Sequence, residues 1–193
     1  MSEKYIAFIP EDWRFVPSDE ERRGIIEALV SAGIISGDPS DPESLRNGPA
    51  YETLFRDTDP KPAVDGEGMG CDPGRMVVHV RSGEFMGFAG DNLSPVACNH
   101  CDAELPYEEA QDAFYALKDG EGPESPRLQM ECYHCGEHTP AVGADFANTG
   151  GFASFAIVFE GETSNRIEVD PRGLEQLGKI VGKPMTWVQV HGW

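Results

Sequence analysis

Two Cys-x-x-Cys pairs constrain this chain more than any other feature. The first pair is Cys98 and Cys101, the second is Cys132 and Cys135, and 30 residues separate them. Zinc prefers four soft ligands at the corners of a tetrahedron, and a Cys-x-x-Cys turn places two thiolates on one side of the ion. Gly136 permits the tight backbone turn of such a knuckle. The pattern predicts a structural Zn²⁺ site with four cysteine ligands, although the spacer exceeds the usual length of about 15–20 residues.

The spacer itself predicts a small insertion built around this site. Residues 105–120 have the sequence LPYEEAQDAFYALKDG, which is typical of a short helix, and residues 127–132 (RLQMEC) predict a strand that returns to the second pair. The inner side of the helix is expected to carry Tyr107, Ala110, Phe114 and Leu117. An excursion of about 55 residues barely sustains its own core, so a bound metal would stabilise it.

Redox catalysis and catalytic zinc are the alternatives to this interpretation of the cysteine pairs. Disulfide oxidoreductases activate the first cysteine at a helix N-terminus. Here the predicted helix starts four or five residues after Cys101, and Cys135 leads into GEHTPAVG, which is not helical. A catalytic zinc usually keeps three protein ligands and an open position, whereas four cysteines favour a closed site.

The histidines near the pairs offer a further alternative. His100 and His134 could each replace a cysteine as a ligand, but side chains inside a knuckle normally point outward. His138 is free to hydrogen-bond to one of the ligands. The simpler interpretation of all three is an exposed polar side chain. Cys71, which lies far from either pair, is most simply a lone free thiol because no partnering base can be identified.

Outside the cysteine region, the chain predicts the elements of an α+β scaffold. Ser18 and Glu21 form a capping box at the start of one helix, and Asp170 followed by Pro171 starts another. The expected strands are 5–9, 76–80, 150–159 and 186–193, and the expected helices are 18–33 and 170–182. This βαββαβ order is that of the ferredoxin-like arrangement, an antiparallel sheet with two helices on one face.

We therefore predict two units. Residues 1–83 and 141–193 form the ferredoxin-like scaffold, and residues 84–140 form a zinc-ribbon-like insertion. Within the scaffold, residues 37–75 are rich in Pro, Gly and Asp and predict an irregular surface excursion, with at best a short helix around residues 50–56.

The excess of acidic residues restricts the kinds of molecule that this protein can bind. The chain has 15 Lys and Arg against 34 Asp and Glu, a formal net charge of −19. Such a surface repels nucleic acid and anionic membranes and suits a basic protein partner. The longest apolar stretch, FASFAIVF at 152–159, is too short to span a bilayer. The N-terminus shows no secretory signal, so the paired cysteines predict reduced thiols in the cytoplasm.

Several of these segments together resemble a family of small, uncharacterised bacterial proteins. The shared motifs are Y-x-x-F-I-P at 5–10, a C-P-x-C-G-A-E-L-like knuckle at 98–105, A-x-D-A at 110–113, a C-C-G-like knuckle at 132–136, G-F-A-R-F at 151–155 and L-G-x-P-L-x-x-I-x-x-H-Y at 181–193. The resemblance covers roughly residues 5–35 and 85–193. Asn99 replaces the knuckle proline, and the second pair is Cys-x-x-Cys rather than adjacent cysteines. The ligand count is unchanged, and the resemblance implies the architecture without implying an activity.

Two classes of function fit these observations. The first is a non-enzymatic zinc protein that binds another protein, as an inhibitor or immunity-type partner of a basic protein. Its contact surface would be the acidic spacer helix, with Glu108, Glu109 and Asp112 outward. The second class is an enzyme whose site the sequence hides, or a thiol-redox protein that uses the Cys-x-x-Cys pairs. The candidate bases of such an enzyme are His79, His138 and His191.

Overall fold

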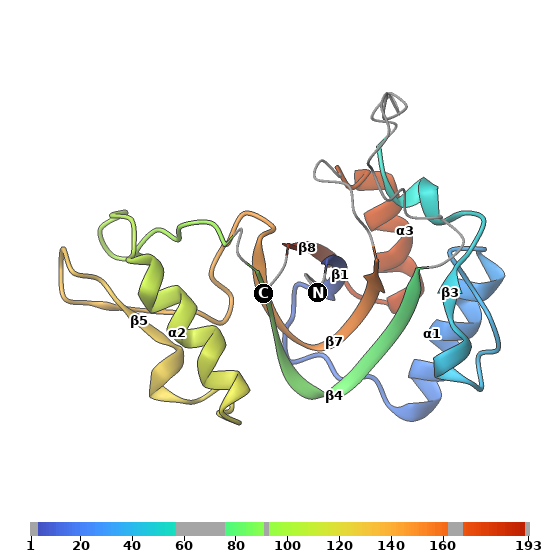
Figure 1. Ribbon diagram of the computed structural model, residues 1–193, viewed down its shortest axis with the longest axis horizontal. Coiled ribbons are helices and arrows are strands. Elements are labelled where there is room, and N and C mark those ends of the chain that lie inside the picture. The colour runs from blue at the N-terminus through green and yellow to red at the C-terminus, as the bar shows by residue number, and fades with distance from the viewer. Residues whose placement is uncertain (1–3, 57–75, 91–92, 162–167, 192–193) are drawn as a thin grey trace, which may run out of the picture.

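The computed structural model describes residues 4–56, 76–90, 93–161 and 168–191 of the 193-residue chain. The fold is a mixed α+β fold with an antiparallel main sheet (Figure 1). Helices α1 (Asp19–Ser31) and α3 (Pro171–Val181) lie on one side of this sheet. Residues 93–149, here called the cysteine lobe, extend away from the sheet and carry α2 (Tyr107–Lys118).

The main sheet has the strand order β2-β3-β4-β7-β1-β8, and every neighbouring pair is antiparallel. Its strands are β1 (Lys4–Pro10), β2 (Ile35–Ser36), β3 (Arg46–Asn47), β4 (Val77–Ala89), β7 (Gly150–Glu160) and β8 (Met185–His191). The four long strands, β8-β1-β7-β4, form most of the sheet, with β8 at one edge, and the two-residue strands β2 and β3 extend it beyond β4.

Local sequence signals explain both helices on the sheet. Ser18 accepts a hydrogen bond from the backbone N–H of Glu21, and the Glu21 carboxylate accepts one from the backbone N–H of Ser18, as the predicted capping box requires. Asp170 caps α3 through the backbone N–H of Arg172, and Gly182 ends it in the left-handed conformation, with φ 75°. These predictions are confirmed.

Strand β7 separates two apolar layers because its side chains alternate between the faces of the sheet. Phe155, Ile157 and Phe159 face the core beneath α1 and α3. Ala156 and Val158 face the opposite layer, which also contains Phe88 and the β8 valines and is equally buried. Ala153 joins this second layer beyond the register shift between β4 and β7. Figure 1 shows that the long strands β4 and β7 are strongly curved.

The first part of the segment predicted to be irregular contains short ordered elements. These are the 3₁₀ helices η1 (Pro42–Ser44) and η2 (Tyr51–Leu54) and strand β3. Leu45, Tyr51 and Leu54 are buried in the core beneath the helices. Buried apolar residues thus anchor this part of the chain despite its many Pro and Gly residues. The remainder, residues 57–75 with Cys71, lies outside the described residues.

Strand β4 is longer than the predicted strand at residues 76–80. It continues through an irregularity in register between Ser82 and Met86 and pairs with β7 up to Ala89. A bulge breaks the alternation of polar and apolar residues, so the second half of the strand has no simple sequence signature. This second half brings the chain to the cysteine lobe.

Candidate metal centre

Two similar turns carry the four cysteines. Cys98 and Cys101 lie in a turn flanked by the isolated bridge between Ala97 and Glu104. Cys132 and Cys135 lie in the turn that joins β5 (Gln129–Glu131) to β6 (His138–Pro140), which form a two-stranded sheet. Helix α2 and the 3₁₀ helix η4 (Pro126–Leu128) connect the first turn to the second.

The backbone of the two turns is nearly the same. The N–H of Asp102 donates to the carbonyl of Cys98 at 3.0 Å, and the N–H of Gly136 donates to the carbonyl of Cys132 at 2.7 Å. The residue after each second cysteine adopts the left-handed conformation, with φ 59° at Asp102 and 75° at Gly136. Glycine and, less readily, aspartate tolerate this conformation. The predicted role of Gly136 is confirmed.

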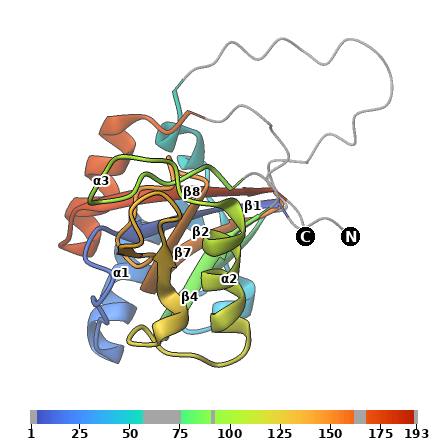
Figure 2. The same ribbon diagram turned by 90° about the vertical axis from the view of Figure 1, so that its left-hand side faces the viewer.

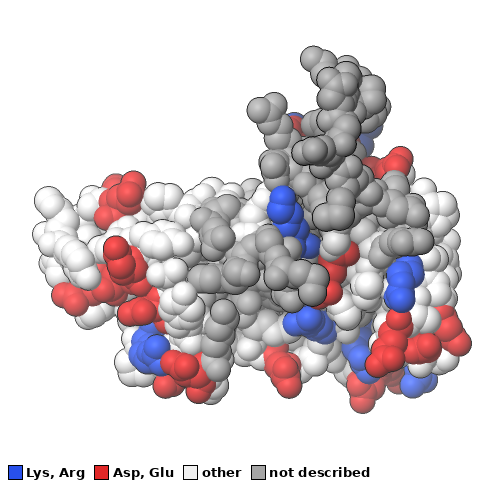
Figure 3. Space-filling view, viewed as in Figure 1, with Lys and Arg blue, Asp and Glu red and all other residues white. Residues whose placement is uncertain are grey.

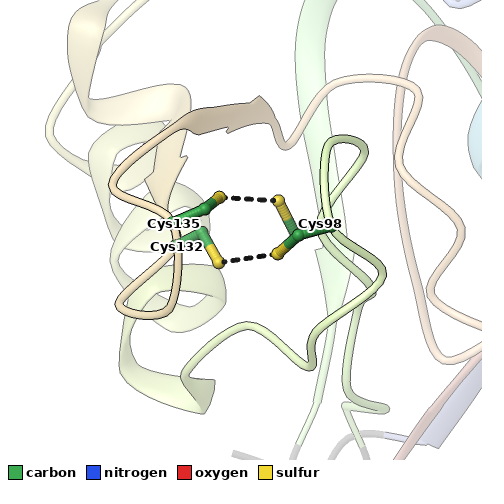
Figure 4. A group of neighbouring side chains, drawn as sticks. Cys98, Cys132 and Cys135 are labelled. Carbon is green, nitrogen blue, oxygen red and sulfur yellow. Dashed lines mark hydrogen bonds between the residues drawn. The ribbon is translucent and has the colours of Figure 1, made fainter.

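The turns bring the four thiols together at one point. The four Sγ atoms all lie within 4.8 Å of one another, which positions them to bind a metal ion. Cys98 Sγ lies 3.8 Å from Cys135 Sγ, and Cys101 Sγ lies 3.7 Å from Cys132 Sγ (Figure 4). A tetrahedron with metal–sulfur bonds of about 2.3 Å has edges of about 3.8 Å. A disulfide would require a sulfur–sulfur distance of about 2.05 Å.

Burial and acidity differ among the thiols. Cys98 is buried, and a hydrogen bond from the backbone N–H of His100 lowers the pKa of its thiol to about 6. Cys135 is exposed. The backbone hydrogen bond at Glu137 lowers the pKa of Cys135, but partial desolvation of the sulfur and the three neighbouring thiols together raise it to about 12. The low pKa of Cys98 and the raised pKa values of Cys101 and Cys135 arise from the close approach of the four thiols and from their backbone hydrogen bonds.

Side chains from α2 and β6 hold the knuckles in place. Thr139 is fully buried, and its hydroxyl accepts a hydrogen bond from the backbone N–H of Asn99 at 3.2 Å. The Glu109 carboxylate accepts one from the backbone N–H of Glu131 at 3.0 Å and another from the Tyr133 hydroxyl, also at 3.0 Å. No local sequence pattern marks Thr139 or Glu109, because each contacts a residue more than 20 positions away.

Two predictions for α2 are therefore corrected. Glu109 was expected on the outward side of α2, but its side chain is half-buried and hydrogen-bonds to the second knuckle. Tyr107 was expected to pack inward, but it lies in the first turn and is 40% exposed. Ala110 and Phe114 do face the core of the lobe, where they pack in one cluster with Cys98 and Cys132.

The histidines considered as bases lie on separate elements. His138 is on β6 and exposed. His79 is on β4, where its Nε2 lies 3.3 Å from the Glu160 carboxylate. His191 is on β8, and burial lowers its pKa. Strands β7 and β1 separate β4 from β8 in the sheet. His100 and His134 are exposed within the knuckles, as predicted.

No protein-family model, curated protein or solved structure matches this chain. The family resemblance drawn from the motifs stays a prediction. The predicted convergence of the two cysteine pairs is confirmed, whereas the binding of zinc by these residues is not tested by the geometry alone. Within the described residues, no helix is both long and apolar enough to cross a membrane.

Proposed function

We propose that this chain is a zinc-binding protein in which Cys98, Cys101, Cys132 and Cys135 hold one Zn²⁺ in a structural role. The observation that carries the proposal is the approach of all four Sγ atoms to within 4.8 Å of one another. Thiolate sulfurs in this arrangement suit zinc or iron, and four cysteines leave no open position for a substrate. The burial of Cys98 and Cys132 in the core of the lobe also supports a structural role.

The metal content of the purified protein tests this proposal. Elemental analysis under reducing conditions should find one zinc per chain. Cys132→Ser should lose the metal, whereas His134→Ser, which changes an exposed neighbour of a ligand, should keep it. A fully folded protein without metal would contradict the proposal, and stoichiometric iron would correct the identity of the ion.

We also propose a fold for the two parts of the chain and a location in the cytoplasm. The strand order β8-β1-β7-β4 supports a ferredoxin-like scaffold. These are the fourth, first, third and second long strands along the chain, and the strands of that fold have the same order. The two knuckles joined by a helix support a zinc-ribbon-like insertion. The described cysteines are free thiols, and thiolate ligands persist where thiols stay reduced, which favours the cytoplasm.

We further propose that the protein acts by binding a basic protein rather than by catalysis. Asp and Glu side chains are spread over the cysteine lobe at the left of Figure 3, where few Lys or Arg side chains appear. Between Cys98 and His138 the chain has ten Asp and Glu residues but only Lys118 and Arg127. A field of this sign speeds the association of a basic protein and disfavours nucleic acid.

We propose that the basic partner contacts the exposed side of α2 that carries Glu108 and Asp112. A pull-down with wild-type protein is compared with Glu108→Lys/Asp112→Lys, which leaves the Glu109 contacts intact. The control is Glu20→Lys/Glu27→Lys, which makes the same change of charge on exposed positions of α1. Loss of one basic protein with the first variant alone would support the proposal. Identical partners for all three proteins would exclude this side of α2.

A further inference from the structure

A cavity of about 300 Å³ lies where the second half of β4 passes α2. Figure 2 shows α2 beside β4, and a Cβ added at Gly87 would approach the Leu117 side chain to 2.7 Å. Aromatic side chains from β1, β4 and α2 line the cavity: Tyr5, Phe85, Phe88, Phe114 and Tyr115. The volume is at the lower end of the range for small-molecule sites, about 300–1,000 Å³.

Two opposite charges lie side by side in the lining. Arg81 Nη2 lies 3.6 Å from Glu160 Oε1, and both side chains are about half exposed, at 51% and 43%. An ion pair this long and exposed holds its members only weakly. His79 approaches the other oxygen of Glu160. The guanidinium has five N–H donors, so contact with one carboxylate oxygen leaves donors available for a second carboxylate.

We infer that this cavity binds a small aromatic zwitterion, a free amino acid with an aromatic side chain being the simplest example. The carboxylate of the ligand would pair with Arg81 and its ammonium group with Glu160, while its ring would pack between the aromatic walls. The two charges of an α-amino acid are separated by one carbon atom, and the charges of Arg81 and Glu160 are also adjacent. A zwitterion forms two charge-assisted contacts without breaking the local charge balance.

Ligands with a single charge fit the cavity less well. An aromatic carboxylate would pair with Arg81 but would meet the negative Glu160 and a protein of net charge −19. An aromatic amine would pair with Glu160 but would meet Arg81. Each therefore gains one ion pair and adds one repulsion, which makes the ligand preference a direct test of the inference.

Titration calorimetry on the full chain as purified provides that test. The probes are L-phenylalanine, phenylacetate and phenethylamine, which share a ring and differ in charge. Phenylalanine should bind about tenfold or more tightly than either analogue, because each analogue loses one charge-assisted contact. Failure of all three probes to bind at millimolar concentration, or equal binding by all three, would overturn the inference.

Two variants should switch the preference in opposite directions. Glu160→Gln removes the repulsion of a carboxylate and should make phenylacetate the best of the three ligands. Arg81→Gln should do the same for phenethylamine. The control is the exposed pair of Arg56 and Glu168, at 3.3 Å, which is not part of the cavity lining. Arg56→Gln and Glu168→Gln should leave all three affinities unchanged, and an equal effect of the control variants would contradict the inference.

The inference does not depend on the identity of the metal, but it does depend on α2. Phe114, Tyr115 and Leu117 supply one wall of the cavity, so a variant that releases this helix should lose phenylalanine binding. Cys132→Ser should abolish both metal and ligand binding if zinc holds the lobe. Binding of phenylalanine to a folded protein that never contained metal would support this inference and contradict the proposed zinc site, so the two can fail separately.

Discussion

At the scale of single residues, the left-handed positions in the two knuckles show how one dihedral angle restricts the sequence. Gly136 has φ 75°, and a Cβ at this position would meet nothing within 4 Å. A substitution therefore introduces backbone strain without a clash. Non-glycine residues in this conformation cost about 1–2 kcal/mol.

We accordingly predict that Gly136→Ala lowers the free energy of unfolding by about 1 kcal/mol. The matched control is Gly122→Ala, in the same lobe, where φ is outside the left-handed region and a Cβ also meets nothing within 4 Å. Urea unfolding of both variants measures the effect. Equal stabilities would show that the second knuckle does not need the left-handed conformation.

The capping box of α1 makes a second prediction at this scale. Hydrogen bonds from the backbone N–H and the hydroxyl of Ser18 lower the pKa of Glu21. The folded state therefore binds this proton less readily than the unfolded chain does. The resulting stabilisation is complete above the unfolded pKa of about 4.3 and disappears as the pH falls through the lower folded value.

Glu21→Gln should therefore lower stability near neutral pH and reduce the loss of stability on acidification. Glu20→Gln changes the neighbouring carboxylate, which takes no part in the capping box, and should leave the acid limb unchanged. Thermal unfolding between about pH 3 and pH 7, a range that includes the carboxylate pKa, compares the stability of the two variants. A steeper acid limb in Glu21→Gln would contradict the assigned direction of the pKa shift.

At the scale of secondary-structure elements, the predictable features are those fixed by neighbours in sequence. The caps of α1 and α3 and the knuckle turns each depend on residues within a few positions of one another, so the sequence predicts them. The bond from Glu109 to the second knuckle joins residues 22 positions apart, and the bulge in β4 breaks the period on which strand prediction depends. The sequence offers no signal for either feature.

The docking of η2 on α3 is another long-range contact, and glycine makes it possible. A Cβ at Gly173 would lie 2.6 Å from the Cα of Leu54 and 2.9 Å from the carbonyl oxygen of Thr53. These are backbone atoms, so relief requires one element to move. We predict that Gly173→Ala lowers the free energy of unfolding by about 1–3 kcal/mol, as overpacking does.

The control for this change is Gly24→Ala in α1. Gly24 is exposed, and a Cβ there meets nothing within 4 Å, so alanine should raise stability by up to about 1 kcal/mol through its higher helix propensity. Opposite signs in urea unfolding are expected. A stabilising Gly173→Ala would show that residues 51–54 do not pack on α3 as described.

At the scale of the whole molecule, the chain divides its apolar residues among separate clusters. The core beneath α1 and α3 contains no cysteine among its described members, whereas Cys98 and Cys132 belong to the cluster of the cysteine lobe. Strands β4 and β7 connect the two, because Ala89 and Phe152 near their adjoining ends pack into the lobe. We therefore expect the main sheet to remain folded when the lobe opens.

Removal of the metal should consequently unfold the lobe and spare the scaffold. A structural zinc site contributes about 10–16 kcal/mol in small domains, which matches or exceeds the total stability of a typical protein, about 5–15 kcal/mol. After treatment with a chelator, amide hydrogen exchange should accelerate by orders of magnitude in α2, β5 and β6. Exchange in β1 and α1, which contribute buried residues to the main core, should change little.

Two variants make this last prediction specific to the four sulfurs. Cys132→Ser, without chelator, should reproduce the exchange pattern of the chelated protein, and His134→Ser should match wild type both before and after chelation. Restoring zinc should return protection to α2 in the wild type but not in Cys132→Ser. Protection of α2 that survives chelation would show that the apolar cluster around Phe114 and Met130 suffices to hold the lobe. Simultaneous loss of protection in α2 and β1 would show instead that lobe and scaffold unfold as one cooperative unit.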